Sequence, residues 1–198
     1  MAMRIFGDSI SGNCLKVKFV SDFLAIPYQW EEVDILKGES RTPAFLAINP
    51  SGQVPVILLD DGRSIAQSNA IILYLAEGSR LIPGDAFARA KMMEWLFWEQ
   101  YSHEPYIAVA RFQVVYQHKP VAQLEARLVE RGNAALTRLE MAVREQRFLV
   151  GDMMTLADIS LVAYTRMAGQ GGFELDGFPR VQAWVTRVES ALGLGPLD

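Results

Sequence analysis

The chain has 198 residues, a mass of 22.1 kDa and 51% hydrophobic residues, which is enough apolar material for one large core or two small ones. Its 19 basic and 23 acidic residues are well mixed and give a net charge of -4, so no basic face is available for a phosphate backbone and nucleic-acid binding is disfavoured. The first residues contain no apolar stretch of signal-peptide or membrane-span length, which predicts a soluble cytoplasmic protein with no membrane partner.

Few residues could form a disulfide or ligate a metal. Cys14 is the only cysteine, which excludes an internal disulfide framework. The two histidines, His103 and His118, form no metal-ligand cluster with it by spacing, so we expect no metal cofactor. The sequence also contains no Walker loop and no GxGxxG fingerprint.

Strands and helices alternate in the first part of the chain. We expect strands at residues 3–7, 28–35, 54–59 and 63–66, and helices at 14–24, 43–47 and 67–77. Thr42-Pro43 is an N-cap followed by a first-turn proline, and Asp60-Asp61-Gly62 is typical of a hairpin turn. This order of elements is the thioredoxin-like arrangement.

The rest of the chain is expected to be helical. The predicted helices cover residues 86–118, with an interruption at Pro105, then 121–146, and a last helix from Pro179 to near Gly193. Thr155-Leu-Ala-Asp158 forms a capping box that starts a further helix, with Met154 and Ile159 placed as a hydrophobic staple. We therefore predict a domain at 1–78, a linker at 79–86 and an all-helical domain at 87–198.

Val54-Pro55 is the most informative local feature. A proline just inside an apolar strand removes a ladder donor, so it belongs at a sheet edge or bulge. If the bond is cis, as in roughly one X-Pro bond in twenty, the Val54 N–H and C=O turn outward and can pair with a small peptide backbone. Ser68, at the start of the next helix, offers a hydroxyl and N–H groups to a carboxylate.

Four features in register resemble the glutathione transferases. They are the thioredoxin-like first half, Asn49-Pro-Ser-Gly-Gln-Val-Pro55, Gln67-Ser-Asn-Ala-Ile71 with Tyr74-Leu75, and the Thr155–Asp158 cap. Ser11-Gly-Asn-Cys14 is similar to the active-site segment of the serine-type classes, and Asn13 to that of the bacterial theta/Nu-like enzymes. The resemblance covers essentially the whole chain. It implies an α/β N-terminal thioredoxin-like domain plus an all-α C-terminal helical domain.

The resemblance also implies a glutathione site. Gln53, Val54 and Pro55 would face the peptide backbone, and Gln67 with Ser68 would hold the γ-glutamyl group. Gln67 departs from the family pattern, in which an acidic residue precedes the serine. A charge-assisted hydrogen bond is roughly twice as strong as a neutral one, which favours weaker glutathione binding, but the amide oxygen still accepts and the sequence does not decide between the two outcomes. Either Lys37 or Arg41 would meet the glycyl carboxylate, and the sequence does not choose between them.

Ser11 and Asn13 are the candidate catalytic residues. A free thiol titrates near about pH 8.5, and only the thiolate is nucleophilic. A hydrogen bond from the Ser11 hydroxyl, worth about 1.5–3 kcal/mol, would lower the pKa of the glutathione thiol by about one to two units. The Asn13 amide and the helix dipole would add to this effect. The alternatives are that Ser11 only caps the helix, and that Ser9 is the donor.

Cys14 is expected to pack as a small apolar residue. The Ser11-x-x-Cys14 spacing matches the redox pair of thioredoxin-like folds, but a serine stands where the attacking cysteine would be. A dithiol cycle within the protein is therefore excluded. Disulfide reduction remains possible if two glutathione molecules supply both sulfurs.

The resemblance places a small hydrophobic electrophile against the helix around residues 98–107. The candidate wall residues are Ile10, Tyr101, Tyr106, Ile107 and Arg111. Aromatic residues at helical spacing usually belong to the core, and we assign no catalytic role to either histidine, with His103 expected at the surface or as a cap.

The predicted function is a cytoplasmic, homodimeric glutathione transferase of the kind that serves detoxification. It would use glutathione as co-substrate. Glutathione-dependent disulfide or peroxide reduction is one alternative on the same fold. A non-catalytic interaction module is the other.

Overall fold

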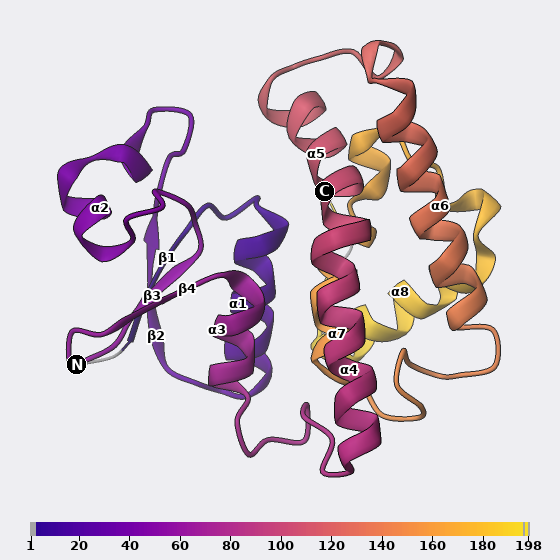
Figure 1. Cartoon of the computed structure of the whole chain (residues 1–198), viewed down its shortest axis with the longest axis horizontal. Helices are drawn as coiled ribbons and strands as arrows, with labels where there is room; N and C mark the ends of the chain where they lie inside the picture. The colour runs from indigo at the N-terminus through magenta and orange to yellow at the C-terminus, as the bar shows by residue number, and fades with distance from the viewer. Residues whose placement is uncertain (1–2, 196, 198) are drawn as a thin grey trace. The chain divides into compact units, whose positions relative to one another are not determined.

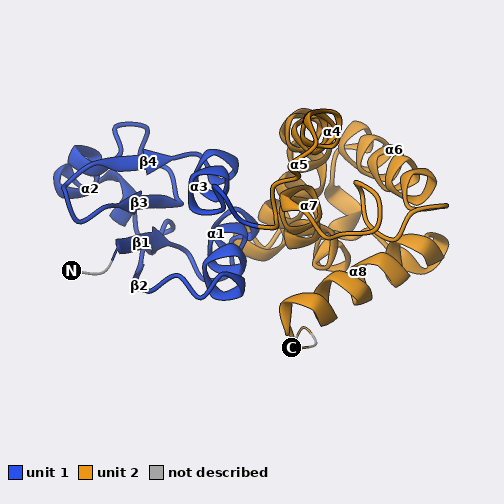
Figure 2. Cartoon of the chain, turned by 90° about the horizontal axis from the view of Figure 1, so that it is seen from below, with its two compact units in different colours: residues 1–79 blue, residues 80–198 orange. Residues whose placement is uncertain are grey.

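The computed structural model describes residues 3–195 and 197, and these form two compact units, divided between residues 79 and 80 of the chain; unit 1 ends at residue 79 and unit 2 begins at residue 80 (Figures 1 and 2). Within the described residues, no helix is long and apolar enough to span a membrane.

Unit 1 is built on a four-stranded mixed sheet of order β2-β1-β3-β4. The strands are β1 (Met3–Gly7), β2 (Tyr28–Glu32), β3 (Val56–Leu58) and β4 (Ser64–Ala66). β1 pairs in parallel with β2, and the other two pairings are antiparallel. The predicted thioredoxin-like arrangement is confirmed.

Helices cover both faces of this sheet. α1 (Gly12–Phe23) and α3 (Ser68–Leu75) pack together on one face, while α2 (Pro43–Ile48) lies on the other, preceded by the short turn η1 (Glu39–Arg41) (Figure 2). On the α2 side, Phe45 packs with Phe6, their rings meeting edge to face 6.2 Å apart, and with Val56. Alternation along the strands sends Ile5 and Ile57, both fully buried, to the opposite face. The sheet therefore has apolar layers on both sides.

Three strands, β2, β3 and β4, are shorter than predicted, and for β2 and β3 the reason is identifiable. β2 ends at Glu32 because Asp34 Oδ1 accepts the N–H groups of both Leu36 and Lys37 and turns the chain. β3 begins at Val56 because Pro55 has no N–H to donate to the ladder.

Unit 2 begins with a long helical run that changes type along its length. It comprises α4 (Ala86–Trp98), the π-helical turn η2 (Glu99–His103), α5 (Glu104–Arg111) and a second π turn, η3 (Phe112–Tyr116). The predicted interruption at Pro105 is a π turn immediately before it and not a break, since proline in the first turn of α5 needs no N–H partner.

Three further α-helices complete unit 2. They are α6 (Ala126–Ala142), α7 (Leu156–Thr165) and α8 (Pro179–Leu192), joined by the short turns η4 (Val121–Gln123), η5 (Ala168–Gly171) and η6 (Leu175–Gly177). The prediction of one helix over 121–146 was wrong at both ends. α8 stops as predicted, because Gly193 adopts a left-handed φ of 67° that favours glycine.

α7 forms the centre of unit 2, and every one of its residues is buried. The predicted capping box is confirmed: the Asp158 carboxylate accepts from the Thr155 N–H at 2.9 Å, and also from the Leu149 N–H and the Trp184 indole N–H, each at 2.9 Å. Burial raises the pKa of Asp158, and these hydrogen bonds offset part of the rise.

Candidate functional site

The opening of α1 holds Ser11 at the N-cap position with an extended backbone of φ -78° and ψ 123°. Its carbonyl accepts the Leu15 N–H at 2.9 Å, so the helix begins there. Within the described residues, however, its side chain accepts no hydrogen bond from the first turn of the helix. Ser11 therefore occupies the capping position without capping.

Cys14 lies one turn further along α1 and is fully buried, which confirms that it packs as a core residue. Burial raises the pKa of its thiol to about 12, although hydrogen bonds from the Asp8 N–H, at 3.3 Å, and from the Ser11 side chain oppose the rise. The thiol is protonated at neutral pH. Because thiol sulfur is a weak acceptor, the Ser11 hydroxyl can leave it at little cost.

The turn before β3 contains a cis Val54-Pro55 bond, the isomer in which the Val54 N–H and C=O are expected to turn outward. The pairing of β3 with β4 begins at Val56, so Val54 precedes the ladder. Asn49 shapes this turn: its Nδ2 donates to the Gln53 carbonyl at 2.7 Å, and its Oδ1 accepts from the Ser51 N–H at 3.2 Å. Gln53 itself is exposed.

The opening of α3 holds Gln67 and Ser68. Gln67 is exposed and has φ 72° and ψ 111°, a backbone conformation that residues other than glycine rarely adopt. Such conformations cost about 1–3 kcal/mol and cluster at ligand-binding sites. Ser68, the first residue of the helix, is buried.

A shared hydrogen-bond acceptor joins the openings of α1 and α3. Asn13 Oδ1 accepts from Ser68 Oγ at 3.0 Å and from Lys16 Nζ at 2.9 Å. Asn13 and Ser68 are each predicted from the sequence, but Lys16 and the link between Asn13 and Ser68 are not. Spacing alone places Lys16 one turn from Asn13 on the same helix face, but only the structure shows that its side chain is buried.

The two cations considered for the glycyl carboxylate differ in their partners. Lys37 is exposed and paired with Asp34, with 2.9 Å between Nζ and Oδ2. Arg41 reaches from η1 to the turn before Gln53, where its Nη1 donates to the Ser51 carbonyl at 3.0 Å. Gly52 makes this approach possible, since it has φ 61° and an added Cβ would lie 2.6 Å from Arg41 Nη1. Arg41 therefore contacts the segment that leads to Val54.

The residues predicted for the second substrate differ in exposure. Ile10 is 47% exposed and Tyr101, on η2, is 83% exposed, whereas Tyr106 is half-buried. Ile107 is fully buried, and Arg111 is buried with its Nε donating to Gln170 Oε1 at 2.7 Å.

His103 is an interior residue and neither a surface nor a capping one. It is fully buried, and its Nε2 lies 3.0 Å from Thr165 Oγ1. That hydroxyl donates to the Leu161 carbonyl, so the histidine nitrogen is the donor in their contact.

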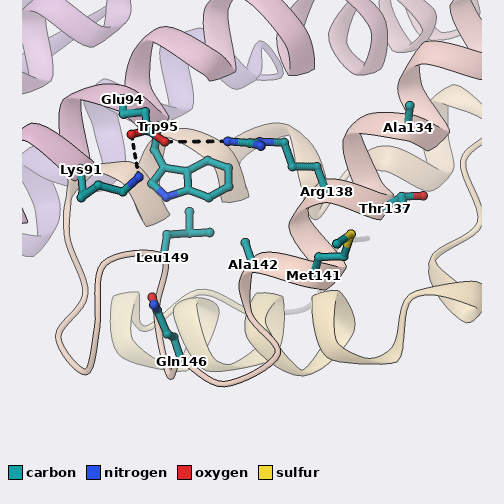
Figure 3. Close-up of a pocket in the computed structure, with 10 residues that line it drawn as sticks. All are labelled: Lys91, Glu94, Trp95, Ala134, Thr137, Arg138, Met141, Ala142, Gln146 and Leu149. Carbon is teal, nitrogen blue, oxygen red and sulfur yellow. Dashed lines mark hydrogen bonds and ion pairs between the residues drawn. The ribbon is translucent and has the colours of Figure 1, made fainter.

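Unit 2 also contains a pocket of about 550 Å³ between α4, α6 and the segment before α7 (Figure 3). Glu94 pairs there with Lys91 at 2.6 Å and with Arg138 at 3.8 Å. The Arg138 guanidinium lies 5.0 Å from the centroid of the Trp95 ring. Of the described residues that line this pocket, none was predicted for the second substrate, and no motif or spacing in the sequence points to the pocket.

Comparisons with known proteins agree with this architecture. Residues 10–77 match the family model described as glutathione S-transferase, N-terminal domain, and residues 97–191 match the corresponding C-terminal domain. The chain is 31% identical to glutathione S-transferase theta-1 of Mus musculus over 98% of this chain and 85% of that protein.

Solved structures give the same result. A glutathione S-transferase from Pseudomonas fluorescens is 45% identical, with a TM-score of 0.92 and 96% of each chain covered. Ure2p in complex with glutathione is 25% identical, with a TM-score of 0.84 and coverage of 97% of this chain and 93% of that one.

The fold is thus that of a two-domain, glutathione-dependent protein class, with a thioredoxin-like unit and a helical unit. The chain belongs to the glutathione S-transferase family, and it is a glutathione transferase.

Proposed function

We propose that unit 1 binds glutathione and ionises its thiol for attack on small hydrophobic electrophiles. The observation that carries this proposal is the contact between Asn13 Oδ1 and Ser68 Oγ, 3.0 Å apart. This contact brings the start of α1, which is suited to a thiolate, next to the start of α3, which is suited to a carboxylate. Both openings carry the positive end of a helix dipole.

Binding would use three parts of unit 1. The Val54 backbone beside Pro55 pairs with the cysteinyl part of glutathione, with Gln53 at the same edge. Gln67 and Ser68 receive the γ-glutamyl group. Ser68 contributes its N–H at the first position of α3, where backbone donors have no partner within the helix.

For the glycyl carboxylate we favour Arg41 over Lys37. Arg41 already contacts the turn that precedes Gln53, and its planar group suits a carboxylate. Lys37 is held by Asp34, a contact that also raises the pKa of Lys37. Arg41→Met should raise the KM for glutathione several-fold, whereas Lys37→Met should leave it unchanged. The opposite pattern would assign the role to Lys37.

Activation would use the Ser11 hydroxyl, which caps nothing among the described residues, and the Asn13 amide. Both donate to the developing thiolate, and the electrophile is attacked by glutathione itself, so no protein base is required at the reacting carbon. The thiol proton passes to solvent on binding.

The second-substrate wall stays a proposal for Ile10, Tyr101 and Tyr106, whose side chains have exposed surface. Ile107 and Arg111 would support this wall from behind, because both are buried. Replacing Tyr106 with Ala should raise the KM for the electrophile and leave the KM for glutathione unchanged.

Reduction of disulfides is the second candidate reaction, and one observation bears on its form. Cys14 is buried and protonated, so the protein supplies no attacking thiolate. One glutathione thiolate would attack the disulfide, forming a mixed disulfide and releasing one thiol. A second would then release the other thiol as oxidised glutathione forms. A purely non-catalytic interaction role predicts neither reaction.

The deciding experiment measures glutathione binding by calorimetry, then turnover with 1-chloro-2,4-dinitrobenzene and with hydroxyethyl disulfide. Binding with faster turnover of the chlorinated substrate supports conjugation, and the reverse ratio supports reduction. Failure to bind millimolar glutathione would refute both.

We further propose a cytoplasmic homodimer. Besides Tyr101, which is assigned to the substrate wall, four large apolar side chains of unit 2 are more than half exposed, which favours a covered surface; they are Phe87, Phe97, Met141 and Met153. Light scattering of the pure protein at micromolar concentration should give twice the 22.1 kDa of one chain.

A further inference from the structure

Lys16 is an unusual residue because its side chain has no exposed surface. Lysine is almost never fully buried unless its ammonium group has polar partners. One of them is Asn13 Oδ1, 2.9 Å from Nζ across one turn of α1. The burial of a charge at this point calls for a reason beyond packing, since an apolar side chain would fill the space at lower cost.

The contact determines how the Asn13 amide is turned. An ammonium group and a hydroxyl both face the same amide atom, at 2.9 Å and 3.0 Å. An amide NH₂ group cannot accept from an ammonium group, so this atom is the oxygen. The Asn13 NH₂ group therefore points away from Lys16, which is the orientation required to donate to a thiolate.

The two donors to this oxygen are not equivalent. The Ser68 hydroxyl has one proton, so it can donate to Asn13 or to a bound carboxylate but not to both. The Lys16 ammonium has three protons and no such conflict. If the Ser68 hydroxyl turns to the γ-glutamyl carboxylate, Lys16 still holds the Asn13 oxygen.

We propose that Lys16 is a positioning residue that keeps the Asn13 amide aimed at the glutathione sulfur while Ser68 engages the ligand. The proposal rests on the proposed glutathione site and adds to it the buried cation on which the Asn13 donor depends. Lys16 acts through Asn13 in two ways. It fixes the orientation of the amide, and its charge polarises the amide so that the NH₂ group becomes a stronger donor.

A merely structural role for Lys16 has a different signature. A bridge within α1 would affect thermal stability and leave the acidity of the bound thiol unchanged. A direct electrostatic effect on the thiolate would lower its pKa whether or not Asn13 is present. The proposed role predicts a pKa effect that disappears when Asn13 is removed.

The test titrates the thiolate absorbance of glutathione bound to wild type, Lys16→Met, Asn13→Ala and the double variant. We expect Lys16→Met to raise the pKa of the bound thiol by about one unit and to lower kcat/KM about tenfold at neutral pH. In the Asn13→Ala background, Lys16→Met should change kcat/KM less than twofold and the pKa of the bound thiol by less than about 0.3 units, because the effects of residues that act through one another are not additive.

Ser21→Ala is the matched control, since Ser21 is a fully buried polar residue on the same helix. It should leave the pKa of the bound thiol at its wild-type value. Lys16→Arg, which keeps the charge, should recover part of the lost kcat/KM. If Lys16→Met does not fold, Lys16→Gln is titrated in its place, and a pKa equal to that of wild type would overturn the proposal.

The outcomes separate the two proposals. A wild type that acidifies bound glutathione, together with a Lys16→Met variant that does so equally well, overturns the role of Lys16 and leaves the glutathione site intact. A pKa rise of equal size in the presence and absence of Asn13 also overturns it. A wild type that binds no glutathione overturns the proposed function and this inference together.

Discussion

The opening of α7 in unit 2 and the openings of α1 and α3 in unit 1 use similar side chains in opposite ways. In unit 2, Thr155 caps α7: its hydroxyl accepts the Ala157 N–H at 3.3 Å, and the Asp158 carboxylate closes the box. In unit 1, Ser11 and Gln67 stand at the openings of α1 and α3, and within the described residues neither side chain caps its helix. A polar residue before a helix thus stabilises the fold at α7, as Thr42 also does at α2, and is available for ligand chemistry at α1 and α3.

The largest expected effect tests the stabilising side of this comparison. Asp158→Ala removes the acceptor of four buried donors, three N–H groups and the Thr155 hydroxyl, and we expect a loss of about 3–5 kcal/mol in the free energy of unfolding. Urea denaturation measures it. The control, Asp85→Ala, removes an exposed cap of α4 and should cost only about 1 kcal/mol. Equal losses in the two variants would show that the buried capping box of α7 stabilises the protein no more than an exposed helix cap does.

Ser11→Ala tests the chemical side. Since its hydroxyl caps nothing among the described residues, we expect a change in stability within about 0.5 kcal/mol. Turnover should fall much further, with kcat/KM for the chlorinated electrophile about 10–100-fold lower at neutral pH. Thr155→Ala should show the reverse, a loss of about 1 kcal/mol in stability with normal turnover of the folded protein. A Ser11→Ala protein that is destabilised yet fully active would show that Ser11 stabilises the fold and does not activate the thiol.

Burial of the Cys14 thiol at the start of α1 makes the free energy of unfolding depend on pH in the alkaline range. Its folded pKa of about 12 lies above the ordinary value of 9.0, so between these values the folded protein keeps a proton that the unfolded chain loses. Below pH 9.0 the thiol is protonated in both states, so its burial contributes fully to the free energy of unfolding. Above pH 9.0 this free energy declines by about 1.4 kcal/mol per pH unit. Cys14→Ala should lack this alkaline decline. Iodoacetamide should modify wild type only in denaturant, and rapid labelling of the native protein would contradict the burial.

Gln67→Glu sharpens the comparison at α3 and should give the smallest effect. A carboxylate at this exposed position would form a charge-assisted bond to the γ-glutamyl ammonium group and should tighten glutathione binding about two- to fivefold. The matched control is Gln29→Glu, also exposed but on β2 at the opposite edge of the sheet, which should leave the affinity unchanged. Calorimetry measures both, and an unchanged or weaker affinity for Gln67→Glu would remove Gln67 from the γ-glutamyl site.

Local signals explain which parts of the fold the sequence predicts. β1, the Thr42-Pro43 start of α2, the Thr155–Asp158 box and the glycine stop of α8 all follow from residues adjacent in sequence. The shortened β2 depends on how the Asp34 side chain turns the backbone. The π turn before Pro105 depends on helix packing, which periodicity does not report.

The same distinction holds for the site. The sequence indicates Ser11, Val54-Pro55 and Ser68 because each stands beside a turn or a helix start. It does not indicate that Asn13 and Ser68 meet, since 55 positions separate them, or that Lys16 is buried beside them. Side-chain contacts between elements distant in the chain require the fold.

The most direct test of the thiol-activating opening is an ultraviolet titration of glutathione bound to the wild-type protein, with Ser11→Ala alongside. We predict that the bound thiol ionises about one to two pH units below the free value near 8.5, and that Ser11→Ala returns it toward that value. A bound thiol that titrates at its solution pKa in the wild-type protein would contradict the account.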